Sequence, residues 1–415
     1  MKQSMLAEEL CERAKAENKN VICFSSAPGR ADFLNTHQDY KMLPVVPVAI
    51  EKRTFVICSK LDKPGIIRVK SLTLEREGVE NEDVFQSEDV KLVEGKWFGN
   101  YFRSIHILFS KRYEKLRTGI AIYVDSEVPV ASGLASSAAL QVSLAAMYAK
   151  LLGLSLSKME LAELAYEAEH NIMGVPCGRL DQYSSSYGGV IKLDFKPAIS
   201  VEEFDGSGLI FVIADSGVRH STAEIHPVRQ SELNTAIKML RESKVPEPLL
   251  KMLDGDYATV EWKLLEEGSL RKYLSTLPQS LANRIIFTLR MQNSTETALE
   301  ILKCRRVKKG SLYKMGLKPT DNWMEALGEI VNMQHVLLRD FYEVSHPKLE
   351  KMRDAALEAG ALGVKISGAG MGGSLLALVK RPEDATNVEK AFANAGASSV
   401  FTTGVGEGVS STLLS

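Results

Sequence analysis

The sequence predicts a two-domain α+β protein with the division near residue 205, and three observations support this. A chain of 415 residues exceeds what one ordinary compact core holds. In its first half, apolar runs typical of strands alternate with helical patterns. The second half is mainly helical up to about residue 362 and then gives strands around a glycine-rich loop, an order that favours an antiparallel sheet. We therefore expect domains at 1–205 and 206–415.

The first half opens with an amphipathic pattern over residues 2–17, which predicts a helix. Apolar runs at 21–25, 45–50 and 54–58 predict strands, and so does the alternating segment 119–130. These runs supply one sheet of the first domain.

A small-residue stretch then leads into two helices. Apolar residues at three- and four-residue intervals predict a helix over 138–152, which Gly153 ends. Ser157 and Glu160 form a capping box at the start of the next helix. The end of that second helix leads directly into the loop 169–182.

The second half begins after a looser stretch at 196–208, where we place the domain boundary. Residues 209–217 and 374–379 read as strands. A helix near 382–395 and a last strand at 398–405 complete the pattern.

Composition and charge narrow the class of protein. With 45% hydrophobic and 25% charged residues the chain is of globular type. A net charge of −1 gives no global attraction to nucleic acid or to an anionic membrane. The charged start lacks the apolar core of a signal peptide and no apolar run approaches ~18 residues, so we expect a cytoplasmic protein. Its five widely spaced cysteines indicate reduced thiols rather than disulfides or a zinc site.

The small-residue loop at 129–139 has the character of a phosphate-binding site. Small residues let backbone N–H groups close on an anion, and the helix that starts here adds its positive end. The loop lacks the lysine of a Walker P-loop. A tight turn before a core helix would explain Gly133 but not the run of hydroxyls, and both interpretations remain open.

Two further loops carry the remaining chemical signal. The glycine-rich loop 367–374 is followed by a strand pattern rather than a helix, which argues against a dinucleotide fingerprint. The segment 169–182 places Glu169 at a helix end and Asp181 after a Gly/Pro turn. Phosphoryl transfer to an alcohol needs a metal on the phosphates and a carboxylate near the hydroxyl, which these two residues can supply. The structural alternative is that Asp181 caps a helix.

Together with Ala27–Arg30 and His37–Tyr40, these loops resemble the GHMP kinase superfamily and, within it, the galactokinases. The resemblance extends nearly end to end and includes the segments 97–101, 218–221, 227–229 and 338–345. It implies an N-terminal domain like the second domain of ribosomal protein S5 and a C-terminal ferredoxin-like α+β domain. It also implies an ATP-dependent kinase that transfers the γ-phosphoryl group to a hexose hydroxyl, the anomeric O1 of galactose or of a close relative.

The resemblance assigns roles at the phosphate side of the site. It makes Asp181 the catalytic carboxylate and Arg30 the cation beside it, and it makes Ser137 and Glu169 the magnesium ligands. Trp97 matches an aromatic residue near the adenine. The other residues that would surround ATP are Ser132, Gly133, Leu134, Ala135, Ser136, Gly368 and Gly370.

At the sugar side the resemblance assigns His37, Asp39 and Gly178 to contacts with the acceptor. Three residues depart from the family pattern there. Thr36 stands where galactokinases carry a glutamate that contacts the C6 hydroxyl, His226 replaces a tyrosine, and Arg179 stands where an apolar residue is usual.

These departures remove one carboxylate and add two potential cations near the acceptor. One hypothesis is therefore a C6-modified substrate such as a uronic acid. Against it, Arg179 can pair with a structural acid while Thr36 binds the C6 hydroxyl.

Two alternatives concern activity: a sugar- and ATP-sensing regulator without turnover, or another GHMP branch such as mevalonate or homoserine kinase. The expected partner is a small-molecule sugar, not nucleic acid or a membrane, and the sequence leaves monomer and homodimer open.

Overall fold

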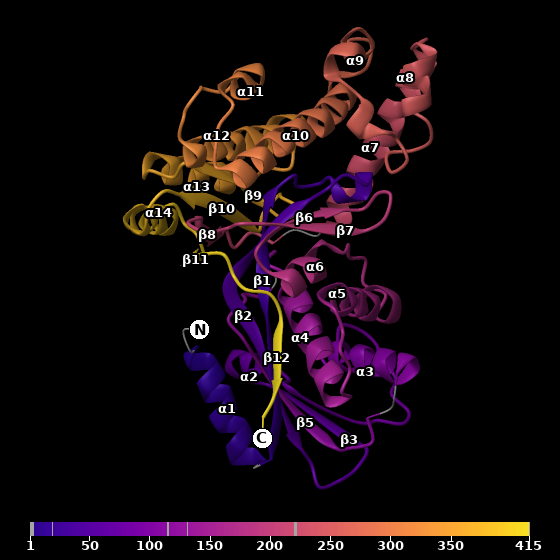
Figure 1. Cartoon of the computed structure of the whole chain (residues 1–415), viewed down its shortest axis with the longest axis vertical. Coiled ribbons are helices and arrows are strands. Elements are labelled where there is room, and N and C mark those ends of the chain that lie inside the picture. Colours follow the sequence, from indigo (N-terminus) through magenta and orange to yellow (C-terminus); the bar gives the residue numbers. More distant parts are fainter. Residues whose placement is uncertain (1–3, 19, 114–115, 131, 220–221, 415) are drawn as a thin grey trace.

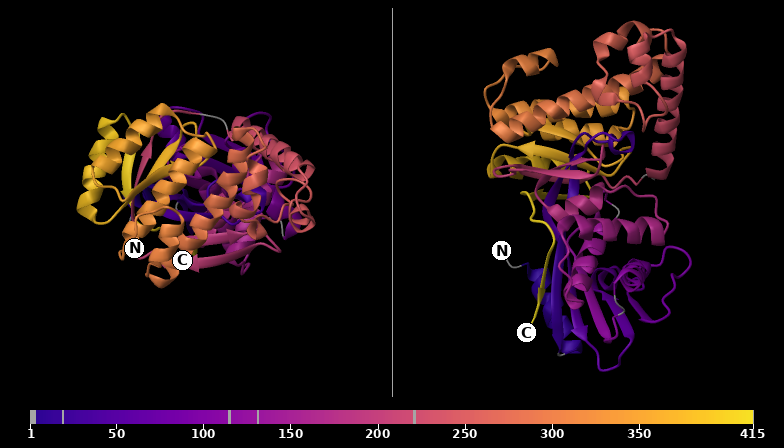
Figure 2. Two further views of the ribbon diagram at one scale, coloured as in Figure 1. Left: turned by 90° about the horizontal axis from the view of Figure 1, so that it is seen from above. Right: turned by 45° about the vertical axis from the view of Figure 1, so that its right-hand side comes forward.

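The computed structural model describes residues 4–18, 20–113, 116–130, 132–219 and 222–414, with the side chains of 222–224 left out of the description. The molecule is elongated, with one β-sheet in the lower part of Figure 1 and a second sheet under a layer of helices in the upper part. Both marked ends of the chain lie beside the first sheet (Figures 1 and 2).

The first sheet contains eight strands. They are β1 (Val21–Leu34), β2 (Val46–Lys60), β3 (Ile66–Ser71), β4 (Glu82–Gln86), β5 (Ile120–Ser126), β6 (Val190–Asp194), β7 (Ser200–Phe204) and β12 (Ser410–Leu413). Six of them follow the order β12-β1-β2-β5-β3-β4, while β6 pairs with β2 and with β7. All of these pairs are antiparallel except β3 with β5.

Two expected strands are longer than the sequence suggested. The runs at 45–50 and 54–58 belong to the single strand β2, and β1 continues past residue 25 to Leu34. The second part of β1 contains Pro28, Arg30 and Asp32, which break the apolar pattern, and the pairing register shifts between Pro28 and Arg30. Because these residues interrupt the apolar pattern, the sequence did not predict this part of the strand.

The helices of the first half pack on this sheet or on one another. They are α1 (Met5–Glu17), α2 (Leu72–Glu77), α3 (Asn100–Arg112), α4 (Ser136–Leu151), α5 (Lys158–Glu167) and α6 (Leu180–Tyr187), with the short turns η1 (Asp39–Lys41) and η2 (Ala168–Ile172). The predicted capping box of Ser157 and Glu160 is present at the start of α5. Helix α4 is buried along most of its length and packs on β1 and β2.

The second sheet has the order β11-β8-β10-β9, and every neighbouring pair in it is antiparallel. Its strands are β8 (Ile210–Asp215), β9 (Gly363–Ser367), β10 (Ser374–Val379) and β11 (Ser399–Thr403). In chain order this is four-one-three-two, the arrangement of a ferredoxin-like sheet, as expected.

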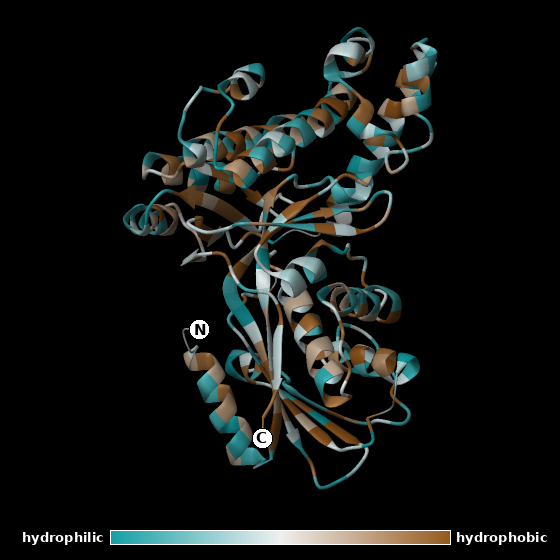
Figure 3. Cartoon of the chain, viewed as in Figure 1, coloured by the Kyte–Doolittle hydropathy of each residue, from teal (hydrophilic) through white to brown (hydrophobic). Residues whose placement is uncertain are grey.

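Helices cover the second sheet and build the upper part of the molecule. They are α7 (Thr222–Glu242), α8 (Glu247–Met252), α9 (Glu267–Leu274), α10 (Gln279–Cys304), α11 (Lys309–Lys314), α12 (Trp323–Val336), α13 (Pro347–Glu358) and α14 (Pro382–Asn394), with the turns η3 (Trp262–Leu264) and η4 (Leu337–Phe341). In Figure 3 hydrophilic and hydrophobic residues are interspersed along the long helix α10, and its buried positions include the polar residues Arg284, Thr288 and Gln292.

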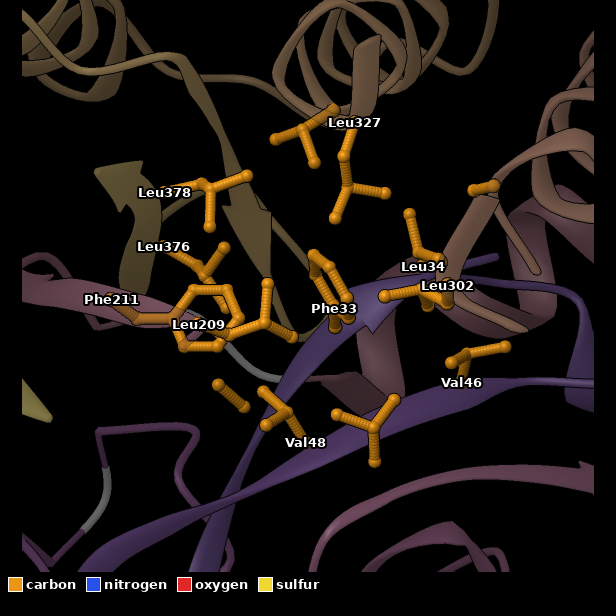
Figure 4. Packing of buried hydrophobic residues seen from close by; sticks show 14 of the residues in the cluster. Phe33, Leu34, Val46, Val48, Leu209, Phe211, Leu302, Leu327, Leu376 and Leu378 are labelled. Carbon is orange, nitrogen blue, oxygen red and sulfur yellow. The ribbon is translucent and has the colours of Figure 1, made fainter. Parts of the chain in front are cut away.

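One apolar cluster joins the two sheets. Phe33 and Val48 from the first sheet pack with Phe211 and Leu376 from the second, and Leu327 of α12 closes the cluster (Figure 4). The rings of Phe33 and Phe211 meet edge to face at 5.1 Å. Strand β1 therefore ends in a core that both halves share.

Two features depart from the expected organisation. The stretch 196–208, expected to be loose, contains β7, which pairs with β6. Residues 410–413, expected in the second domain, form β12 and pair with β1 in the first sheet. The division near residue 205 stays a prediction.

No helix in the described part of the chain is long and apolar enough to cross a membrane. Cys11, Cys23, Cys58, Cys177 and Cys304 are free thiols, as expected.

Candidate active site

Arg30 of β1 and Asp181 of α6 form a close ion pair where the first sheet meets the second. The Arg30 Nε donates to Asp181 Oδ1 at 2.9 Å, and Nη2 lies 2.6 Å from the same oxygen. Asp181 stands in the first turn of α6, where the helix dipole favours a negative charge. Burial raises the pKa of Asp181, and the positive charge of Arg30 only partly offsets this effect. The pair therefore places a carboxylate of raised basicity beside a fixed cation.

Arg30 also holds the small-residue loop in front of α4. Its Nη1 donates to the carbonyl of Gly133, and its backbone N–H donates to the carbonyl of Leu134 at 3.0 Å. Gly133 and Ala135 adopt left-handed backbone conformations, with φ of +75° and +61°. Because α4 starts at Ser136, its first N–H groups lack helical partners and are available to an anion. The start of α4 can therefore present backbone N–H groups to an anion, and phosphate binding by this loop stays a prediction.

Ser137 and Glu169, the expected magnesium ligands, are brought together from α4 and η2. Burial raises the pKa of Glu169, and a hydrogen bond with the Ser137 side chain opposes that rise. Gln182 Nε2 donates to Glu169 Oε2 at 2.9 Å and fixes the carboxylate.

One hydroxyl and one carboxylate fit Mg²⁺, which prefers oxygen ligands and completes its shell with phosphates and water. Within the described residues no three His, Cys, Asp or Glu gather as a metal site of their own. Ser137 and Glu169 supply two oxygen ligands, so a bound Mg²⁺ would need further ligands from phosphate or water.

On the acceptor side, His37, Asp39, Gly178 and His226 lie close together. The His37 and His226 rings are 5.2 Å apart, and His37 Nε2 lies 3.0 Å from the carbonyl of Ala369. A Cβ atom on Gly178 would stand 3.3 Å from Asp39 Oδ2, so this glycine leaves the carboxylate accessible. Burial lowers the pKa of both histidines and raises that of Asp39. The histidines are therefore neutral near pH 7.

Thr36 is buried and connected to a lysine of the second sheet. Lys365 Nζ donates to Thr36 Oγ1 at 2.8 Å, to the Asp32 carbonyl at 2.8 Å and to the Ile366 carbonyl at 2.9 Å. The three ammonium hydrogens are thus used within the protein. Since Thr36 Oγ1 accepts from Lys365, its own hydroxyl hydrogen is free to be donated to a ligand.

Arg179 has partners within the protein. Its Nε donates to Glu163 Oε1 of α5 at 2.8 Å, and its guanidinium lies 4.0 Å from the centre of the Tyr166 ring. The Tyr183 hydroxyl donates to the same Glu163 oxygen at 2.7 Å. Arg179 thus links the loop before α6 to α5, in line with the structural alternative, and a contact of Arg179 with the acceptor stays a prediction.

The glycine-rich loop is tied to β1 and to the small-residue loop in front of α4. The Gly368 N–H donates to Asp32 Oδ2 at 3.0 Å, and Ser374 Oγ donates to the Ser132 carbonyl at 2.8 Å. Gly370 has a φ of +86°, and a Cβ there would lie 2.2 Å from the carbonyl oxygen of Val344. Gly370 is required by packing, whereas Gly368 faces the carbonyl of Gly133.

Trp97 precedes α3, and its ring lies 4.6 Å from that of Phe98. Its Nε1 is buried with no hydrogen-bond partner among the described residues. Tyr101 of α3 interacts electrostatically with Glu169, so the start of this helix lies near one of the two expected magnesium ligands. A contact of Trp97 with adenine stays a prediction. In the segment 218–221, His220 and Ser221 lie outside the described residues.

Sequence reasoning missed Asp32 and Lys365. Asp32 follows Arg30 by two residues, a spacing that places both on one face of a strand. That signal was available only once β1 was known to reach Leu34. Lys365 is fully buried in the middle of β9, and nothing in the local sequence distinguishes it from an exposed strand lysine.

Comparisons with known proteins agree with this geometry. The chain matches the models of the GHMP kinases N terminal domain (residues 100–189), the GHMP kinases C terminal domain (321–398) and the galactokinase galactose-binding signature (13–60). It is 30% identical to a galactokinase of Chloroflexus aurantiacus over 85% of this chain and 83% of that protein.

Two solved structures share the fold. The Lactococcus lactis galactokinase complexed with galactose has a TM-score of 0.76 and 21% identity, covering 97% of this chain and 99% of that one. The Methanococcus jannaschii mevalonate kinase has a TM-score of 0.66 and 16% identity, covering 92% and 98%.

Proposed function

This chain belongs to the galactokinase family of GHMP kinases and is a sugar kinase of that type, and we propose that it phosphorylates the anomeric hydroxyl of galactose or of a close neutral relative. The observation that carries the proposal is the Arg30–Asp181 pair. Its guanidinium reaches the phosphate loop at Gly133, while its carboxylate stands at the start of α6. One pair of side chains would thus contact both the phosphoryl donor and the acceptor hydroxyl.

In the transfer, the sugar oxygen forms a bond to the γ-phosphorus of ATP while the bond from that phosphorus to ADP breaks. The hydroxyl proton passes to Asp181, which must be ionised to accept it. Burial makes this carboxylate a better base than an exposed aspartate. Arg30 holds positive charge next to the transferring group, where negative charge is spread over the phosphoryl oxygens.

ATP and Mg²⁺ are the proposed donor and metal. Ser137 and Glu169 would hold the metal, which would neutralise phosphate charge. The backbone of residues 132–137 would bind the phosphates, with the start of α4 adding its dipole. Trp97 would pack near the adenine, and Gly368 would let the glycine-rich loop approach the phosphates.

For the sugar, we propose that Asp39 accepts hydrogen bonds from ring hydroxyls, with His37, Gly178 and His226 shaping the pocket. The free hydrogen of Thr36 would be donated to the C6 oxygen.

The surroundings favour a neutral acceptor over a uronic acid. Arg179 is paired with Glu163 and Lys365 has used its three hydrogens, while His226 is neutral because burial lowers its pKa. Asp32, Asp39 and Asp181 add carboxylates of like sign to that of a uronate. A carboxylate-bearing sugar would meet repulsion that Arg179, Lys365 and His226, as the structure describes them, are not free to offset.

The test is an acceptor panel of galactose, N-acetylgalactosamine, galacturonate, arabinose and mevalonate, with MgATP in excess. Galactose or another neutral hexose should give the highest kcat/KM, and phosphorus NMR should show an anomeric phosphate rather than a primary ester. A preference for galacturonate would overturn the neutral-acceptor proposal, and a primary ester would overturn the anomeric one.

Asp181→Asn separates a kinase from a sensor. Replacing a positioned base should lower kcat by about 10²- to 10⁴-fold, while calorimetry should still detect sugar binding. Sugar binding by the wild type without turnover of any acceptor would favour a sensor. The cytoplasmic location and the oligomeric state stay open to experiment.

A further inference from the structure

Asp32 lies at the centre of the site, although no motif of the sequence points to it. Its side chain is 11% exposed, and Oδ1 lies 3.4 Å from Arg30 Nε. Arg30 and Asp32 stand two residues apart on β1, so both side chains lie on one face of the strand. Since Arg30 also binds Asp181, a single guanidinium is held between two carboxylates.

The other polar groups of Asp32 bind the region around the glycine-rich loop. Oδ2 accepts the Gly368 N–H at 3.0 Å, and the Asp32 N–H donates to Ser367 Oγ at 2.9 Å. Its carbonyl accepts from Lys365 at 2.8 Å. A displacement of the loop would therefore move Asp32, and with it the carboxylate that faces Arg30.

Oδ1 acts through charge alone. It is buried, and among the described residues it has no hydrogen-bond partner. A second carboxylate near Arg30 opposes the effect of that cation on Asp181, since like charges disfavour ionisation.

Among the described residues, the charged and titratable groups that act on Asp181 include Arg30 and Asp32 from β1, Glu169 from η2 and Cys177 from the following loop. Asp39 of η1 acts on Arg30. Lys365 of β9 interacts with Arg30 and Asp32. Of this set, Asp32 is the carboxylate that contacts the cation bound to Asp181.

Building on the proposed function, we propose that Asp32 is a positioning residue of the phosphoryl transfer: it holds Arg30 between two carboxylates and transmits the position of the glycine-rich loop to the Arg30–Asp181 pair. Without the Asp32 charge, Arg30 would lower the pKa of Asp181 more strongly, although burial would still raise it. Asp181 would then be a weaker base, and its ionisation would extend to lower pH.

Asp32→Asn tests the charge while keeping an oxygen that can accept the Gly368 N–H. The acid limb of kcat/KM for galactose, at saturating MgATP, should move by roughly one pH unit to lower pH. On the plateau kcat should fall by about threefold. This follows if Asp181 becomes tenfold less basic and the rate of proton transfer varies with about the square root of its basicity. Asp32→Ser, which also removes the charge, should show the same shift of the acid limb and serves if Asp32→Asn does not fold.

Asp125→Asn is the matched control. Asp125 is a buried aspartate on β5, and Arg76 Nη1 donates to its Oδ2 at 2.9 Å. This variant should lose stability but keep the acid limb of the wild type. If the Asp32 variants lose stability and their acid limb also superimposes on the wild type, Asp32 has only a structural role and the proposal is overturned.

A second measurement does not depend on turnover. Amide hydrogen exchange over 367–373 should accelerate in Asp32→Ala and stay unchanged in Asp125→Asn. Unchanged exchange in Asp32→Ala would overturn the coupling to the loop. A wild-type protein that phosphorylates no sugar would refute the proposed function, whereas normal wild-type turnover with an unshifted Asp32→Asn profile refutes this inference alone.

Discussion

Replacing Lys365 by methionine should change how the stability of the protein depends on pH. The Lys365 side chain is fully buried in β9, and burial lowers its pKa from the ordinary 10.5 to about 8. The unfolded chain keeps this proton up to about pH 10.5, whereas the folded chain releases it near pH 8. Between these values the unfolded state binds more protons, so stability rises with pH.

The size of this effect follows from the two pKa values. One unit of difference corresponds to about 1.4 kcal/mol, so the charged lysine costs roughly 3 kcal/mol near pH 7. Most of that cost disappears as the folded lysine loses its proton. The difference in unfolding free energy between the wild type and Lys365→Met should therefore shift in favour of the wild type by roughly 2.5 kcal/mol between pH 7 and pH 10.

Urea denaturation of both proteins at pH 7, 8, 9 and 10 measures this difference, and titrations elsewhere in the chain cancel in it. Lys192→Met is the matched control. Burial lowers the pKa of Lys192, but the hydrogen bond and charge of Asp194 outweigh burial and raise it, so the wild type should keep a constant advantage over this variant from pH 7 to pH 10. A difference between wild type and Lys365→Met that does not change with pH would refute the reasoning.

Two further predictions concern packing and specificity. Gly370→Ala should destabilise the fold by about 2 kcal/mol or more, because its Cβ would lie 2.2 Å from the Val344 carbonyl oxygen at a φ of +86°. Gly268→Ala in α9, where nothing lies within 4 Å, should be neutral or slightly stabilising, and equal thermal shifts in both variants would contradict this. Arg179→Met should change kcat/KM for galactose and galacturonate by the same factor, because Glu163 and Tyr166 occupy the guanidinium. A selective loss of the galacturonate rate would show that Arg179 contacts the sugar.

Features encoded by neighbouring residues could be predicted from the sequence. The capping box of Ser157 and Glu160 lies within one helical turn, and the small residues before α4 mark a strand-to-helix turn wherever they occur. The four strands of the second sheet also follow from local patterns, and their order along the chain favoured the antiparallel sheet that the structure has. The phosphate loop and the helix behind it were accessible in the same way.

Features that depend on distant pairing could not be predicted. Arg179 donates a hydrogen bond to Glu163, which lies sixteen residues earlier on α5. Lys365 donates to the carbonyl of Asp32, which is more than three hundred residues away in the sequence. A single sequence does not say which acid will neutralise which base. The acceptor side of the site was therefore harder to predict than the small-residue loop, whose turn depends on the backbone conformation of neighbouring residues.

The return of β12 to β1 has a consequence for how the chain is made. On the ribosome, β1 emerges early and pairs with β2 soon afterwards, but its other edge stays open until residues 410–413 have been synthesised. The strand that contains Arg30 and Asp32 therefore gains its second neighbour only after almost the whole chain has been synthesised. Such long-range pairing slows folding and leaves a bare strand edge during synthesis. A ribosome that stops before residue 410 would release a chain with that edge unprotected, a state that chaperones and proteases recognise.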